Sequence, residues 1–150
     1  MTLQEAYNFF ESLKIETTKK SEIRVYEKFL HTLTELKNRD FSKDEIQSIE
    51  AELDRLNLES NPGNRKKYYG KALHKLNDYL RKTFSLIPNG YYTTIGTALG
   101  LAFGPVLGVL FGSFFERSLG ISIGISIGII IGLLAGQYLD SQAKTAGNVL

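Results

Sequence analysis

The sequence predicts an all-α protein in two parts, a small helical bundle followed by a two-helix transmembrane hairpin. Residues 1–90 carry 16 of the 18 lysines and arginines and 14 of the 16 acidic residues. Two charge-free runs follow, residues 93–115 and 118–139, and each is longer than the roughly 20 residues that a bilayer-spanning helix needs. We therefore expect a soluble bundle over residues 1–90, a hairpin over residues 91–139 and a short polar tail over residues 140–150.

Apolar residues at helical spacing predict four helices in the first part. Thr2 and Glu5 have the spacing of a capping box, which places a short helix from there through Leu13. A second helix is expected from about Ser21 to Asn38. Each helix has one apolar stripe, which is typical of a small bundle and not of an unstructured tail.

The third and fourth helices have clear start signals. Ser42 and Glu45 form a second capping box, and Phe41 is placed to contact Ile46 as a hydrophobic staple. Residues 61–64, with the sequence Asn-Pro-Gly-Asn, are expected to interrupt helical structure after the third helix. The fourth helix is predicted from about residue 65 to residue 86.

Residue types that support catalysis are scarce. The chain has no cysteine, which excludes disulfides, thiolate metal sites and cysteine nucleophiles. His31 and His74 are the only histidines, and neither belongs to a metal-ligand spacing, so we interpret both as structural or surface residues. No phosphate-binding glycine loop follows a strand. We expect no enzyme activity, no cofactor and no metal.

The fourth helix is strongly basic, with Asp78 as its single acidic residue. A solvated helix face is one interpretation. A juxtamembrane helix that contacts anionic lipid headgroups is the favoured one, because such lipids attract basic side chains near a membrane. Nucleic acid is a less favoured partner, since the whole chain carries a net charge of only +2. The expected headgroup contacts are Arg65, Lys66, Lys67, Lys71, Lys75, Arg81 and Lys82.

Only Glu116 and Arg117 separate the two apolar runs, so the spans must be antiparallel. The side that holds both chain ends carries the seven basic residues of the fourth helix together with Lys144, whereas the turn carries Arg117 alone. By the positive-inside rule both termini are expected in the cytoplasm. Residues 1–5 lack a basic, apolar leader, and the expected location is the cell membrane, which is the inner membrane in a bacterium.

Glycine spacing is the most specific feature of the hairpin. Glycine costs about 1 kcal/mol relative to alanine in a soluble helix, but in a membrane it lets two helix backbones approach closely. The expected helix-packing residues are Gly96, Gly100, Gly104, Gly108, Gly112, Gly120, Gly124, Gly128, Gly132 and Gly136.

Over residues 92–139 the chain resembles the glycine-zipper membrane proteins, whose two helical spans carry GxxxGxxxG repeats. The resemblance implies that the helices pack in homo-oligomers, some of which are channels or pores. The lipidated cysteine of the outer-membrane members is absent, so their location does not carry over.

Three functional interpretations differ in copy number and chemistry. In the first, the protein self-associates through its glycines as a pore-forming or membrane-disrupting effector that its cytoplasmic bundle regulates. In the second, the hairpin is a membrane anchor and the bundle is an adaptor that binds a protein partner. An enzyme is the third and least favoured.

One structural alternative concerns residues 120–129, where small residues and isoleucine alternate as in a transmembrane strand. The apolar runs are twice the length that such a strand needs, which favours helices.

Overall fold

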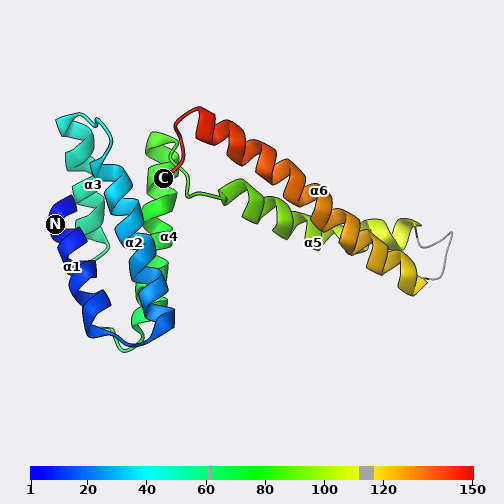
Figure 1. Ribbon diagram of the computed structural model, residues 1–150, viewed down its shortest axis with the longest axis horizontal. Helices are drawn as coiled ribbons and strands as arrows, with labels where there is room; N and C mark the ends of the chain where they lie inside the picture. The colour runs from blue at the N-terminus through cyan, green and yellow to red at the C-terminus, as the bar shows by residue number, and fades with distance from the viewer. Residues whose placement is uncertain (61, 112–116) are drawn as a thin grey trace. The chain divides into compact units, whose positions relative to one another are not determined.

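The computed structural model describes residues 1–60, 62–111 and 117–150, and every regular element in these ranges is an α-helix. The all-helical fold class is therefore confirmed, and residues 120–129 lie within a helix and not in a strand. Figure 1 shows the helices in chain order. They are α1 (Leu3–Glu16), α2 (Lys20–Lys37), α3 (Lys43–Arg55), α4 (Arg65–Phe84), α5 (Tyr91–Phe111) and α6 (Arg117–Thr145).

The chain divides into two units, residues 1–87 with Leu150 and residues 88–149. In the first unit α2 packs against both α1 and α4. The core is rich in aromatic rings: Phe10 of α1 stacks on Phe29 of α2 with 4.0 Å between ring centroids. Tyr69 of α4 meets Phe10 edge-on at 5.5 Å. These rings are almost fully buried and supply much of the apolar area that stabilises a bundle of this size.

Both predicted capping boxes are present. The Thr2 side chain accepts the N–H of Glu5, and the Glu5 carboxylate accepts the N–H of Thr2 at 2.7 Å. Ser42 and Glu45 form the same pair of bonds at the start of α3. Each box satisfies backbone donors that the first turn of a helix otherwise leaves without partners.

Two helices continue beyond the segments that the sequence analysis delimited. α1 continues past Leu13 to Glu16, because no glycine or proline interrupts it there. α6 continues through residues 140–145, which we expected to form a polar tail. It stops where Gly147 adopts a positive φ of 73° and the N–H of Asn148 reaches back to the Ala143 carbonyl at 2.9 Å. This arrangement is a Schellman motif, for which glycine is the favoured residue.

Candidate membrane hairpin and basic helix

In the second unit α5 and α6 pack against each other along their length. Both are long and apolar enough to cross a membrane, over Tyr91–Leu110 and Leu119–Thr145. Their outward surfaces are unusually apolar for residues in contact with water. Sixteen of the 17 large hydrophobic residues that are exposed in the described chain belong to this hairpin, and Ile15 is the other. Exposed apolar surface on that scale marks a membrane or protein contact.

Glycine faces glycine across the hairpin in a constant antiparallel register. A Cβ atom built on Gly104 would lie 2.7 Å from the carbonyl oxygen of Gly124. At the other levels the built atom would lie closer still to the opposite glycine carbonyl. The facing pairs are Gly96 with Gly132, Gly100 with Gly128, Gly104 with Gly124 and Gly108 with Gly120.

The last glycine of α6, Gly136, has no glycine opposite. A Cβ atom built on it would lie 2.5 Å from both the Thr93 Cα and the Tyr92 carbonyl oxygen. At these separations even alanine would force the two backbones apart, which is the steric basis of close packing through small residues. Gly112 and Glu116, which the sequence analysis also singled out, lie outside the described residues.

The constant register shows which contacts the glycines of the two helices make. Steps of four residues drift by about 40° around a helix with 3.6 residues per turn. The two helices nevertheless keep glycine opposite glycine at four successive levels, so these residues are used within one chain.

Asp140 closes the hairpin at the end opposite the turn. Its carboxylate accepts the backbone N–H groups of Tyr92 and Thr93, each at 2.9 Å. Both donors lie in the first turn of α5, where no carbonyl of the preceding turn is available, and negative charge is favourable there. Sequence reasoning missed this contact. The single acidic residue directly after 22 uncharged positions was the signal that could have found it.

Three hydroxyl groups of the hairpin donate to carbonyls four residues earlier in the chain. Thr94 donates to the Gly90 carbonyl at 2.8 Å, Thr97 to the Thr93 carbonyl at 2.7 Å and Ser126 to the Ser122 carbonyl at 2.9 Å. Such bonds satisfy a hydroxyl in an apolar environment without a partner molecule. These three side chains therefore make local contacts in the isolated chain.

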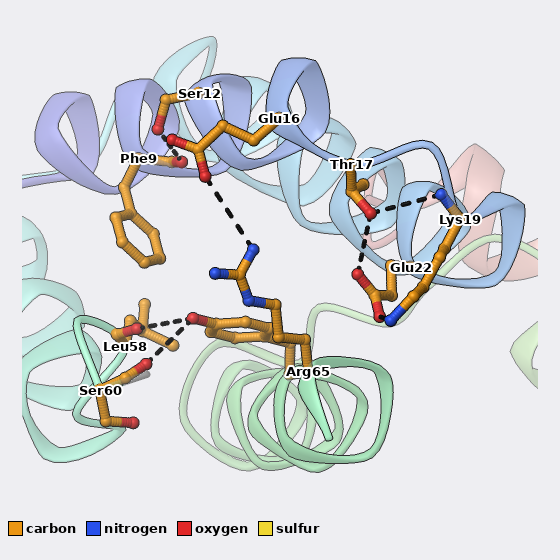
Figure 2. Close-up of polar contacts among 10 residues, drawn as sticks. Phe9, Ser12, Glu16, Thr17, Lys19, Glu22, Leu58, Ser60 and Arg65 are labelled. Atoms are coloured by element: carbon orange, nitrogen blue, oxygen red, sulfur yellow. Dashed lines mark hydrogen bonds and ion pairs between the residues drawn. The ribbon is translucent and has the colours of Figure 1, made fainter. Parts of the chain in front are cut away.

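The seven basic residues predicted to contact headgroups fall into two sets, three that pair with an acidic residue of the bundle and four that are exposed and have no such pair among the described residues. Arg65 lies 4.0 Å from the Glu16 carboxylate at the end of α1, and Figure 2 shows its guanidinium directed toward that residue. Arg81 and Lys82 both pair with Asp78, and they hold the pKa of its carboxyl low, at about 2. The other four are exposed on α4, namely Lys66, Lys67, Lys71 and Lys75.

Further polar contacts of the bundle lie in the neighbourhood of Arg65. Glu22 is buried, and it accepts the Thr17 hydroxyl at 2.9 Å and pairs with Lys19 at 3.3 Å (Figure 2). The Tyr69 hydroxyl donates to the Leu58 and Ser60 carbonyls, each at 3.2 Å, and burial raises its pKa to about 12. The Glu22 contacts join the end of α1 to the start of α2, and the Tyr69 contacts join α4 to the segment that follows α3.

Comparison with known proteins adds no relative to this geometry. No protein family, curated protein or solved structure matches the chain. His31 and His74 are both exposed on the bundle. Over residues 1–60, 62–111 and 117–150, no three side chains of the types that ligate metals gather closely enough to hold an ion.

Proposed function

We propose that this chain is a two-span membrane protein whose hairpin anchors the α1–α4 bundle at a membrane surface. The apolar outer faces of α5 and α6 support insertion, since burial in lipid removes these side chains from water. Two antiparallel spans put both chain ends on the same side of the membrane. The excess of basic residues in residues 1–90 over the single Arg117 at the turn favours the cytoplasmic side.

The observation that carries this proposal is the pairing of glycines inside the hairpin. Because the described glycines of α5 meet those of α6, the close helix packing that they provide is complete within one copy. A hairpin of this kind needs no neighbouring copy to satisfy its packing. It is therefore suited to act as a compact anchor, and the bundle is the part that meets a protein partner.

Self-association, which would include an effector that permeabilises the membrane, is the second candidate. One feature favours it: a shallow apolar groove runs along one side of the hairpin. Phe103 and Leu107 of α5 lie along one wall, Ile131 and Leu139 of α6 lie along the other, and glycines form its floor. A side chain from a second copy could enter this groove and add contacts of the kind that hold membrane helices together.

Copy number separates the two candidates. The purified chain would be inserted into nanodiscs with a large excess of lipid, and the protein mass per disc would be measured by native mass spectrometry. The anchor proposal expects one copy per disc and dye-loaded liposomes that stay sealed. A defined oligomer together with dye release would overturn the anchor in favour of the effector.

A pair of alanine variants locates any oligomer contact. Ala135 lines the groove and Ala98 does not, although both are exposed on the hairpin. If copies meet through the groove, Ala135→Leu fills it and returns the mass to one copy, whereas Ala98→Leu leaves the oligomer intact. Equal behaviour of the two variants would exclude the groove as the contact.

A further inference from the structure

Basic side chains from two helices form one continuous surface on the bundle. Two shallow hollows lie side by side on α2 and α4, and Lys66 lines both. The hollow on α4 holds three further lysines, and the other brings in Arg24 and Lys28 of α2. We call this six-residue set the basic surface: Arg24, Lys28, Lys66, Lys67, Lys71 and Lys75 are all exposed.

The basic surface is not neutralised by the chain itself. Across the described parts of the chain, no ion pair involves any of its six cations. The acidic residue that lines the α2 hollow and the single acidic residue of α4 are both already paired. Glu27 lines the α2 hollow but pairs with Lys14 at 3.0 Å, and Asp78 on α4 pairs with Arg81 and Lys82. The remaining positive charge is therefore available to a partner.

Gly70 leaves a low point in the middle of this surface. It lies in α4 and lines the same hollow as Lys66, Lys67 and Lys71. A Cβ atom built on Gly70 would meet no atom within 4 Å, so the surface is open above the backbone. A phosphate group there could approach the helix while several ammonium groups surround it. The two histidines, His31 on α2 and His74 on α4, also line the hollows.

We propose that the basic surface lies flat on anionic phospholipid headgroups, with α2 and α4 parallel to the membrane plane. Lys66 and Lys75 are separated by about 13 Å along α4 at 1.5 Å per residue. In an upright bundle one of them would lie farther from the lipid than the Debye length of about 8 Å at physiological salt, and its attraction would be screened. All six charges reach the headgroup layer together only when the surface faces it.

This inference rests on the proposed function, because it requires a chain that is held in a bilayer by its hairpin. It adds α2 to the contact, a helix that the sequence alone did not mark as basic. Anionic lipid is favoured over nucleic acid because the hairpin keeps the bundle close to headgroup phosphates at all times. Nucleic acid is retained as an outcome of the test.

The test uses the full chain in nanodiscs. Since the chain has no cysteine, His31→Cys and His74→Cys each give a single labelling site on the basic surface without changing its six cations. A fluorophore at either site would be quenched by lipids that carry a nitroxide on the headgroup. We expect strong quenching in discs with 30% phosphatidylglycerol, weak quenching in pure phosphatidylcholine, and loss of quenching at high salt. A label at Gln47→Cys, on the exposed face of α3, should not respond to lipid charge.

Charge variants then decide whether α2 takes part. In the His74→Cys background, Arg24→Gln with Lys28→Gln should lower the ratio of docked to free bundle by about thirtyfold. The matched control removes the same charge from α3, with Lys43→Gln and Arg55→Gln, and should leave the ratio unchanged. The proposal would be overturned if quenching is the same with and without the α2 substitutions, or if it is equal in neutral and anionic discs.

The remaining outcomes separate this inference from the proposed function. A chain that fails to co-purify with the discs would refute the membrane anchor itself. A chain that inserts but shows no lipid-dependent quenching would refute only the docked bundle. If quenching is absent and a single-stranded oligonucleotide instead changes the fluorescence of the label at position 74, the basic surface binds nucleic acid and the lipid proposal is wrong.

Discussion

The carboxylate of Asp140, near the end of α6, accepts the backbone N–H of Tyr92 in the first turn of α5 at 2.9 Å. The neighbouring N–H of Thr93 donates to its second oxygen at the same distance. One side chain thus caps the first turn of α5, through a residue 48 positions earlier in the chain, and joins the two helices at their shared end. This contact fixes the antiparallel register that also brings Gly136 against the backbone of Tyr92 and Thr93.

Replacement of Asp140 should loosen that end of the hairpin. Loss of a capping side chain costs about 0.5–2 kcal/mol, so Asp140→Ala should raise hydrogen exchange at the Tyr92 and Thr93 amides by about threefold to thirtyfold. Asp140→Asn keeps one acceptor oxygen, so its exchange rates at these amides should lie between those of the wild type and Asp140→Ala. Hydrogen exchange of the full chain in nanodiscs measures this, with Ser141→Ala as control. Unchanged exchange in Asp140→Ala would show that the bond does not hold α5.

A single methyl group between the helices should weaken the hairpin. A Cβ atom on Gly128 would lie 2.9 Å from the Gly104 Cα and closer still to the Gly100 carbonyl, so the backbones must separate. Overpacking of this kind costs about 1–3 kcal/mol, and we expect Gly128→Ala to lower the free energy of unfolding by that amount. Ser126→Thr adds one methyl on an exposed face of α6 and should be nearly silent. Denaturant titration of both variants in mixed micelles measures the difference, and equal stability would contradict the close glycine contact.

The glycine inside α4 should behave in the opposite way. Gly70 lies inside α4, and a Cβ atom there meets nothing within 4 Å. Because alanine is more favourable than glycine in a helix by about 1 kcal/mol, Gly70→Ala should raise the stability of the bundle. Thermal unfolding followed by circular dichroism checks this. A lower melting temperature would mean that the surface above Gly70 is not open.

The α3 cap should make the bundle sensitive to acid. The Ser42 backbone N–H and hydroxyl donate to the Glu45 carboxylate at 2.8 and 2.9 Å, and they lower its pKa below the ordinary value of 4.5. A pKa lowered by folding adds stability that is complete above pH 4.5 and is lost as the pH falls through the lowered value.

Glu45→Gln keeps an acceptor but cannot titrate. The difference in melting temperature between wild type and this variant should therefore be largest at pH 7 and shrink toward pH 3. Glu11→Gln, at an exposed position of α1 outside any cap, is the control. A difference that stays constant with pH would exclude the cap carboxylate as its source.

Local signals in the sequence predicted local structure well. The capping boxes at Thr2 and Ser42 depend only on residues three positions away, and both are present. The two apolar helices followed from charge-free length, and the all-helical fold class is confirmed. The sequence analysis ended the membrane-spanning segment at residue 139, where polar residues begin, and α6 continues beyond that position to Thr145. Polarity ends a membrane-spanning segment, but glycine at 147 ends the helix.

Contacts between distant residues were not predictable from one sequence. Arg65 meets Glu16 only because α1 and α4 pack in a particular register, and sequence reasoning had assigned this arginine to lipid. Arg24 and Lys28 join the lysines of α4 for the same reason. Periodicity identifies the exposed face of each helix, but it does not say which exposed faces lie together.

The central claim is that residues 91–139 cross a bilayer twice, and the location of the turn tests it most directly. Because the chain has no cysteine, Glu59→Cys in the bundle and Ser118→Cys beside the turn each give one labelling site. A membrane-impermeant maleimide is applied to intact cells and then to permeabilised cells. We predict that Ser118→Cys is labelled on intact cells and that Glu59→Cys is labelled only after permeabilisation. Labelling of neither site or of both sites on intact cells would contradict the two-span hairpin with cytoplasmic termini.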